Sequence, residues 1–182
     1  MLTPGQVSEA RTRAIAMLAD AGVALRPDER DRIEVADFGL SELEVTGLEV
    51  LVYVNSERYC AKELVLFPRQ TCPQHRHPPV GALPGKEETF RCRWGEVYLY
   101  LPGAPTTGRH AVIPPGSEAY YTAQAERVMR PGDQVTIPPD TPHWFQAGPL
   151  GAVVTEFSSH STDENDVFFD PRVRRVSEVA RP

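Results

Sequence analysis

The beginning of the chain carries apolar residues at the spacing of an amphipathic helix. Thr3 suits an N-cap and Pro4 the first helical position, while Gly22 suits a C-terminal stop. Between them, apolar side chains recur at helical intervals: Val7, Ala10, Ala14, Ile15 and Leu18. The pattern therefore predicts one helix at the start of the chain.

After this helix the pattern changes to short runs rich in valine, leucine, phenylalanine and tyrosine, which are typical of β-strands. The runs occupy residues 48–54, 60–67, 89–94, 96–101, 134–139 and 151–157. Most of the 18 prolines and 13 glycines lie between the runs, where they indicate turns. This regular spacing predicts an all-β body, a sandwich or barrel, and disfavours a parallel sheet with helices.

Residues 89–101 combine alternation with a glycine. Phe90, Cys92 and Trp94 alternate with two arginines, and Gly95 follows directly. Glycine favours the tight turns of β-hairpins because it adopts positive φ without steric cost. We therefore expect a hairpin that reverses at Gly95.

Composition narrows the class of protein. The chain has 182 residues and a mass of 20.2 kDa, which suits one domain with its own core. No apolar run reaches the roughly 18 residues of a membrane span, and the N-terminus lacks the features of a secretory signal, so we expect a soluble, cytoplasmic protein. The net charge of −6 and the pI near 5.4 disfavour binding to nucleic acid or anionic membranes. A small neutral ligand suits this charge better.

The cysteines predict neither disulfides nor a thiolate metal site. Cys60, Cys72 and Cys92 form an odd set without Cys-x-x-Cys spacing. We expect them to be buried free thiols.

Two short segments hold three of the five histidines. His75 and His77 are two positions apart, so in a strand their imidazoles point to the same face and can reach one ion. A third ligand can come from Glu87 or Glu88, after an excursion rich in glycine and proline, and a fourth from His143. A His-x-His pair alone is a weak signal, but its combination with the strand pattern and the second segment predicts a metal site.

The spacing of these residues resembles the two motifs of the cupin family. Glu88 precedes Gly95 by seven positions, and Gly132, Pro138 and His143 follow one another at intervals of six and five. Within the cupins, the stretches HRHPPVGALPGKEETFRCRWGEVYLYLPG and TEFSSHSTDENDVFFDP resemble bacterial D-lyxose isomerases, a family that includes D-mannose-active members. The long excursion before Glu88 points to this branch of the cupins.

The resemblance covers approximately residues 64–175 and implies a cupin-like β-barrel, the double-stranded jelly roll, with an N-terminal α-helix and few other helices. The whole chain, 1–182, is then expected to be a single cupin domain. In this interpretation residues 1–25 form a helical arm, 64–157 the metal-binding barrel core, and 158–182 a C-terminal segment that packs on the barrel.

The resemblance also implies a divalent metal ion, typically Mn²⁺, held by His75, His77, Glu88 and His143. Three imidazoles and one carboxylate suit a first-row divalent ion, and the absence of thiolates argues against a closed structural zinc site. An octahedral ion with these four ligands keeps positions free for neighbouring oxygens of a sugar.

Three further residues are candidates for catalysis. Glu156 ends the run GAVVTEF and shares a face with Val154, and an inward carboxylate on a core strand is costly unless it serves a metal or a substrate. In family members the equivalent glutamate of the EFS stretch is implicated in catalysis, and the resemblance carries this role over to Glu156. Lys86 can point inward beside Glu88 and hydrogen-bond a sugar oxygen. Asp166 can assist proton transfer if its acidic loop closes the barrel mouth.

Together these residues predict a metal-dependent aldose–ketose isomerase, a sugar ketol-isomerase. It would interconvert D-lyxose and D-xylulose, and also D-mannose and D-fructose, by moving a proton between C1 and C2 through a cis-enediol or enediolate. The alternatives are a cupin metal-dependent oxygenase, which leaves Glu156 and Lys86 without a task, and a non-catalytic sugar-binding cupin. By analogy with cupins we expect a homodimer that binds a monosaccharide and neither nucleic acid nor a membrane.

Overall fold

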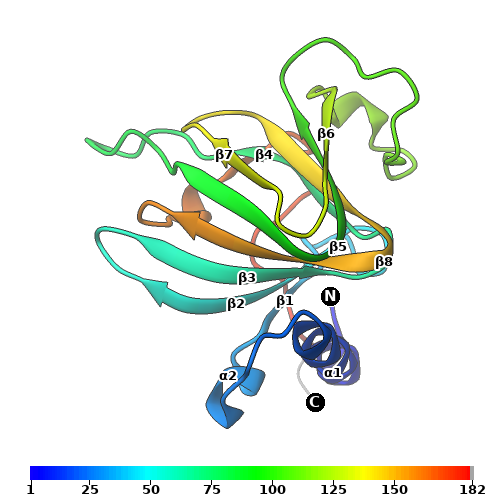
Figure 1. Ribbon diagram of the computed structural model, residues 1–182, viewed down its shortest axis with the longest axis vertical. Coiled ribbons are helices and arrows are strands. Elements are labelled where there is room, and N and C mark those ends of the chain that lie inside the picture. The colour runs from blue at the N-terminus through cyan, green and yellow to red at the C-terminus, as the bar shows by residue number, and fades with distance from the viewer. Residues whose placement is uncertain (181–182) are drawn as a thin grey trace.

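The computed structural model describes residues 1–180. Within them, nine strands form one strongly curled sheet, and a long helix packs against its outer side (Figure 1). None of the helices in this range is long and apolar enough to cross a membrane. The helical elements are α1 (Pro4–Asp20), α2 (Pro27–Asp31) and the 3₁₀ turns η1 (Glu118–Tyr120) and η2 (Asp163–Asn165). The strands are β1 (Glu34–Ala36), β2 (Leu48–Asn55), β3 (Cys60–Leu66), β4 (Thr71–Arg76), β5 (Glu88–Leu101), β6 (Ala125–Met129), β7 (Gln134–Ile137), β8 (His143–Ser158) and β9 (Val167–Phe168).

Two long strands, β5 and β8, connect all parts of the curled sheet. One edge of β8 pairs with β4 and then with β3, and the other edge pairs with β5. β5 in turn pairs with β6 and β7 along its far edge. The strands that pair with one edge of β8, β3 and β4, therefore lie across the interior from β5 and its partners on the other edge. The predicted all-β, cupin-like barrel with an N-terminal helix is confirmed.

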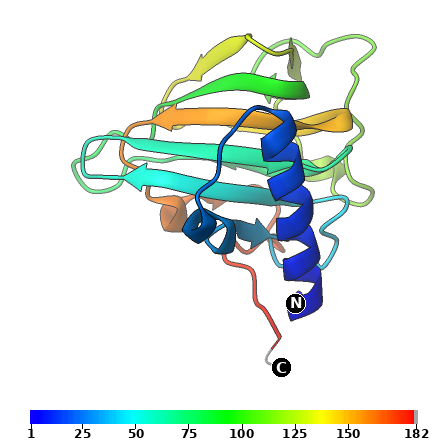
Figure 2. The ribbon, with the colours of Figure 1, turned by 60° about the horizontal axis from the view of Figure 1, so that its bottom comes forward.

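Alternation along the strands separates an interior core from an outer layer. Leu64 and Val154 belong to the apolar cluster inside the barrel. Their neighbours Val65 and Val153 point outward and pack with Leu18 of α1 in a second cluster. Figure 2 shows α1 lying across the outer face of these strands. All three cysteines are buried free thiols, as the sequence predicts.

The N-terminal helix begins where the sequence predicts. The hydroxyl of Thr3 accepts a hydrogen bond from the backbone N–H of Gln6, whose side chain accepts one from the N–H of Thr3. This reciprocal capping box satisfies two backbone donors at the helix start. Pro4 occupies the first turn, where its missing N–H costs nothing.

The hairpin predicted at Gly95 is wrong. β5 continues through Gly95 without reversing, because both of its halves pair with β8. The excursion lies in the partner strand instead, where residues 148–151 bulge out of the pairing. Gly95 does adopt a positive φ of 74°, but the requirement is a close approach: a Cβ at this position would lie 2.0 Å from the carbonyl oxygen of Gly151.

The C-terminal segment returns to the end of the barrel that carries His75. β9 pairs with β4 and places Phe168 opposite His75. Farther along, Val179 forms a parallel bridge with Leu2, so the segment passes beside the start of α1 (Figure 2). Residues 181–182, which the sequence assigns to the same segment, lie outside the described residues.

Replacing Gly95 by alanine tests the close approach of β5 to β8. Gly22 is a matched control, because it has nearly the same φ of 73° but nothing within 4 Å of an added Cβ. Gly22→Ala should lower the free energy of unfolding by about 1–2 kcal/mol through backbone strain. Gly95→Ala should lose about 1–3 kcal/mol more through overpacking. Chemical denaturation measures both values, and equal losses would contradict the close approach.

Candidate metal centre

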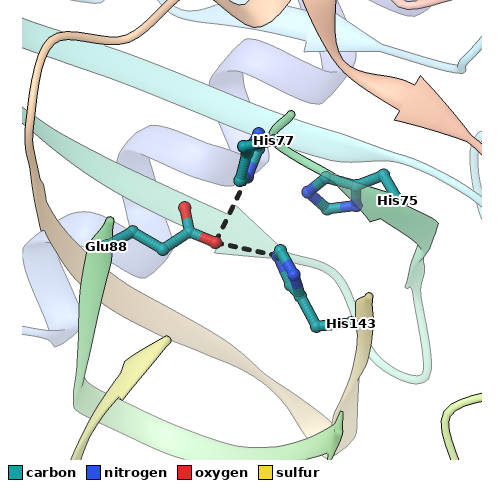
Figure 3. Close-up of side chains that lie close together, drawn as sticks. All are labelled: His75, His77, Glu88 and His143. Atoms are coloured by element: carbon teal, nitrogen blue, oxygen red, sulfur yellow. Dashed lines mark hydrogen bonds and ion pairs between the residues drawn. The ribbon is translucent and has the colours of Figure 1, made fainter. Parts of the chain in front are cut away.

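The four predicted metal ligands meet inside the barrel at the ends of three strands. His75 lies in β4, Glu88 opens β5 and His143 opens β8, while His77 directly follows β4. The register of β4 and β8 pairs His75 with His143. All four side chains are buried, and their ligand atoms lie within 4.8 Å of one another (Figure 3). Glu87, the alternative to Glu88, is exposed.

Each histidine of the cluster has its Nδ1 atom beside an oxygen. Nδ1 of His75 lies 2.8 Å from the carbonyl oxygen of Pro73. Nδ1 of His143 lies 2.9 Å from the carbonyl oxygen of Thr141. Nδ1 of His77 lies 2.5 Å from the carboxylate of Asp166. Carbonyl and carboxylate oxygens only accept hydrogen bonds, so we assign the hydrogen of each neutral ring to Nδ1. The Nε2 atoms then carry lone pairs.

These Nε2 lone pairs converge on a carboxylate. Oε1 of Glu88 lies 2.8 Å from Nε2 of His143 and 3.2 Å from Nε2 of His77 (Figure 3). Nε2 of His143 is buried and makes no hydrogen bond with any residue from 1 to 180, so two acceptors face each other there. A cation removes this conflict, because each of the four side chains can offer it a lone pair. The donor set therefore fits a divalent metal ion.

The charges around the cluster favour a cation. Burial and the two neighbouring imidazoles hold the pKa of His75 well below its usual value. Burial also lowers the pKa of His77, but Glu88 and Asp166 outweigh this effect and raise that pKa to about 9. A positive charge is thus favoured at Nε2 of His77 beside Glu88: a proton at neutral pH, which a metal ion would displace. Burial alone would raise the pKa of Glu88, yet Lys86 and the imidazoles keep it well below its usual range. Glu88 thus stays ionised, and positive charge next to it is stabilised.

Asp166 supports one of the ligands directly. Its carboxylate accepts a hydrogen bond from Nδ1 of His77, on the side of the ring away from Glu88. A carboxylate behind a ligating imidazole fixes the orientation of the ring and increases its basicity. Burial raises the pKa of Asp166 above its usual value. Its predicted part in proton transfer stays a prediction, and the support of His77 is a second task for the same side chain.

Lys86 joins the cluster to the predicted base. It lies in the loop before β5, its side chain is buried, and its Nζ is 2.9 Å from Oε2 of Glu88 and 3.2 Å from Oε1 of Glu156. Burial lowers the pKa of Lys86, but Glu156 and the other carboxylates outweigh it and raise that pKa well above its usual value. Lys86 is therefore an ammonium. Glu156, on the inner face of β8, is only 3% exposed.

The cluster borders a cavity of about 40 Å³. Six of the seven predicted site residues line it, and the fully buried His143 is the exception. One part of the wall is apolar and includes Phe90 and Phe145; the other is charged. The lining extends from Ala36 to Arg175, beyond the predicted core at both ends.

Sequence reasoning misses three charged residues of this lining, Lys62, Asp163 and Arg175. Oδ2 of Asp163 lies 2.8 Å from Nζ of Lys62 and 3.1 Å from Nη2 of Arg175. Lys62 carries a signal, because it lies on a strand face that is otherwise apolar, beside Leu64, and pairs across the sheet with Glu156. Asp163 and Arg175 lie outside the long strands, where no periodicity indicates the direction of a side chain.

The comparisons with known sequences agree with one another. A family model described as D-lyxose isomerase matches residues 33–181. A D-lyxose ketol-isomerase of Thermofilum sp. is 61% identical over 98% of this chain and 99% of its own. A D-lyxose/D-mannose isomerase of Thermosediminibacter oceani is 58% identical over the same shares of the two chains.

Solved structures share the fold at low sequence identity. The L-ribose isomerase of Acinetobacter sp. DL28, in complex with L-ribose, is 15% identical with a TM-score of 0.84 over 98% of both chains. The L-ribose isomerase of Cellulomonas parahominis is 17% identical with a TM-score of 0.80, also over 98% of both chains. The architecture therefore extends over nearly the whole chain, while these identities carry no argument about the ligand.

Removal of one ligand should weaken metal binding. After treatment with a chelator, the chain should bind about one Mn²⁺, and His143→Ala should lower the affinity by more than about tenfold, because the second-sphere changes alone cost about 10- to 100-fold. His110→Ala is the control, since His110 is exposed and lies outside the cluster. Isothermal titration calorimetry measures both variants. Equal affinities would argue against the metal centre.

Removal of the carboxylate charge behind His77 should weaken binding without abolishing it. Asp166→Asn should lower the affinity for Mn²⁺ about 10- to 100-fold at unchanged stoichiometry. Glu164→Gln is the matched control, because Glu164 is an exposed acidic residue of the same segment. Competition with a chromophoric chelator measures the affinities. An Asp166→Asn variant as tight as the control would show that Asp166 does not support the ligand.

Proposed function

The chain belongs to the D-lyxose isomerase family of aldose–ketose isomerases, and from this premise we propose that it interconverts D-lyxose and D-xylulose, and also D-mannose and D-fructose. The names of relatives at 58% and 61% identity support both substrate pairs. The resemblance expected from the sequence is confirmed, and an oxygenase or a non-catalytic cupin is thereby set aside.

A homodimer in the cytoplasm remains part of the proposal. The side chains of Tyr59 and Phe157 are exposed aromatic surfaces, which a second copy of the chain would cover.

The observation that carries this function is the position of Glu156. Lys86 bridges Oε1 of Glu156 and Oε2 of Glu88, so the carboxylate of Glu156 stands one side chain away from the ligand cluster in the same cavity. Isomerisation needs such a pair of features: a place where the sugar oxygens bind, and a base beside the carbons. An oxygenase would give Glu156 and Lys86 no task.

In the direction from aldose to ketose, the bond between C2 and its hydrogen breaks and a new bond from C1 to hydrogen forms. We assign this proton to Glu156, which takes it from C2, holds it while the sugar is a cis-enediolate, and delivers it to C1. The hydroxyl proton moves meanwhile from O2 to O1. A divalent cation bound by His75, His77, Glu88 and His143, Mn²⁺ in our proposal, would polarise the carbonyl and stabilise negative charge on the sugar oxygens.

Lys86 and Asp166 are assigned to the sugar oxygens. The ammonium of Lys86 can donate a hydrogen bond to an oxygen that gains negative charge during the reaction. Asp166 lines the cavity beside His77 and can accept a hydroxyl proton as it moves between oxygens. D-lyxose and D-mannose have the same configuration from C2 to C4, so both sugars present the same reacting end. Side chains at the far end of the cavity would therefore have to discriminate between the two sugars.

A turnover assay with metal replacement tests the proposal. The chelator-stripped protein should form D-xylulose from D-lyxose and D-fructose from D-mannose only after Mn²⁺ is restored. Glu156→Gln should lower kcat about 10²- to 10⁴-fold, the usual contribution of a positioned acid or base, and should still bind the metal. Glu87→Gln is the matched control, because Glu87 is an exposed glutamate outside the cavity.

The possible outcomes separate the parts of the proposal. Ketose formation that depends on Mn²⁺ and is lost in Glu156→Gln supports the isomerase and its base. An active Glu156→Gln enzyme would remove Glu156 from that role. A wild-type protein that binds Mn²⁺ stoichiometrically and converts neither sugar would refute the proposed substrates.

A further inference from the structure

The chain contains only two lysines, Lys62 and Lys86, although lysine and arginine together number 19. Every other cationic side chain of these two types is an arginine. Both lysines are buried, and both line the cavity that contains Glu156. Lysine carries a compact ammonium with three hydrogens, whereas arginine is a wide planar fork. The placement of the two lysines therefore points to a requirement of this cavity.

Lys62 lies directly across the sheet from the proposed base. The register of β3 and β8 pairs Lys62 with Glu156, and Nζ of Lys62 lies 3.9 Å from Oε1 of Glu156. Lys86 contacts the same oxygen at 3.2 Å. No hydrogen bond among residues 1–180 uses the second oxygen, Oε2. The carboxylate of Glu156 is thus held through Oε1 by two ammonium groups, and Oε2 is left for the transfer of a proton.

The hydrogens of the Lys62 ammonium are committed to protein groups. Nζ lies 2.9 Å from Oγ of Ser161 and 2.8 and 3.1 Å from the two carboxylate oxygens of Asp163. Burial lowers the pKa of Lys62, but Glu156 and Asp163 outweigh it and raise that pKa above its usual value, so the ammonium stays charged. These hydrogen bonds to Ser161 and Asp163 engage the three hydrogens, and Glu156 at 3.9 Å is held by charge alone. Lys62 can act on the reaction only through Glu156.

We propose that Lys62 is a positioning residue of the isomerisation, which anchors Glu156 through Oε1 so that Oε2 faces the sugar. The inference rests on the proposed function, in which Glu156 carries the proton. Ser161 and Asp163, both from the C-terminal segment, hold the anchor in place. A displacement of a reacting group by about 1 Å can slow a reaction about 100-fold. Loss of the anchor therefore affects the chemical step more than the binding of the sugar.

Lys62→Met removes the ammonium and keeps the length of the side chain. With D-lyxose and Mn²⁺ we expect kcat to fall about 10- to 100-fold while KM stays within about threefold. The kinetic isotope effect with D-lyxose deuterated at C2 should rise, because proton transfer then limits turnover. Arg130→Met is the matched control, since Arg130 is an exposed cation paired with Glu96. An unchanged kcat, or a loss confined to KM, would overturn the inference.

A second measurement does not depend on the folding of the Lys62→Met variant. Because the chain has two lysines, protein labelled with ¹³Cε-lysine gives two lysine side-chain signals in an NMR spectrum, and Lys86→Met assigns them. Glu156→Gln should shift both signals, because both ammonium groups contact Oε1 of Glu156. A Lys62 signal that stays in place would show that Lys62 does not hold the base.

Failure of this inference and failure of the proposed function look different. If the function is wrong, the wild-type protein with Mn²⁺ forms no ketose. If only the anchor is wrong, the wild-type protein is active and Lys62→Met matches it in kcat and in isotope effect.

Discussion

Burial of four hydrogen-bond acceptors at one point inside the barrel is the constraint on which the rest of the structure depends. Two backbone carbonyls and Asp166 take the Nδ1 hydrogens of the histidines, so the Nε2 lone pairs and the carboxylate of Glu88 converge. Such a set is costly in a low-dielectric interior unless a cation compensates it. The carbonyls belong to β4 and to the turn before β8. Backbone carbonyls thus select the tautomers of His75 and His143, and the fold itself arranges the four side chains of the candidate metal centre.

The same need for compensation explains the charged half of the cavity. Anions and cations alternate along one series of contacts: Glu88, Lys86, Glu156, Lys62, Asp163, Arg175 and Glu34. Each carboxylate touches at least one ammonium or guanidinium, which is the condition under which ionised groups can be buried. The members come from both ends of the chain and from its middle. The interior is therefore complete only when the C-terminal segment has returned to the barrel.

The sequence predicts those parts of the molecule that depend on local pattern. Periodicity finds the helix, the main strands and the inward direction of Glu156, and the spacing of histidines and glutamates finds the cluster. Pattern alone misreads Gly95, because a glycine required by a close approach between strands looks like one required by a turn. It cannot find Asp163, whose position follows from a 3₁₀ turn and from partners distant in sequence. The inward direction of Lys62 can be predicted, because the alternation that identifies Glu156 applies equally to β3, the strand that pairs with it.

The small volume of the cavity bears on how a sugar would enter the site. Its volume of about 40 Å³ is well below the roughly 300–1,000 Å³ of typical small-ligand sites. Most of the wall consists of strands held by long ladders, whereas the C-terminal segment adds only the short strand β9. Widening the cavity is therefore least costly on that side. It would separate Asp163 from Lys62 and Asp166 from His77, the contacts behind the proposed base and one candidate ligand. The charged wall is therefore complete only when the C-terminal segment is docked on the barrel.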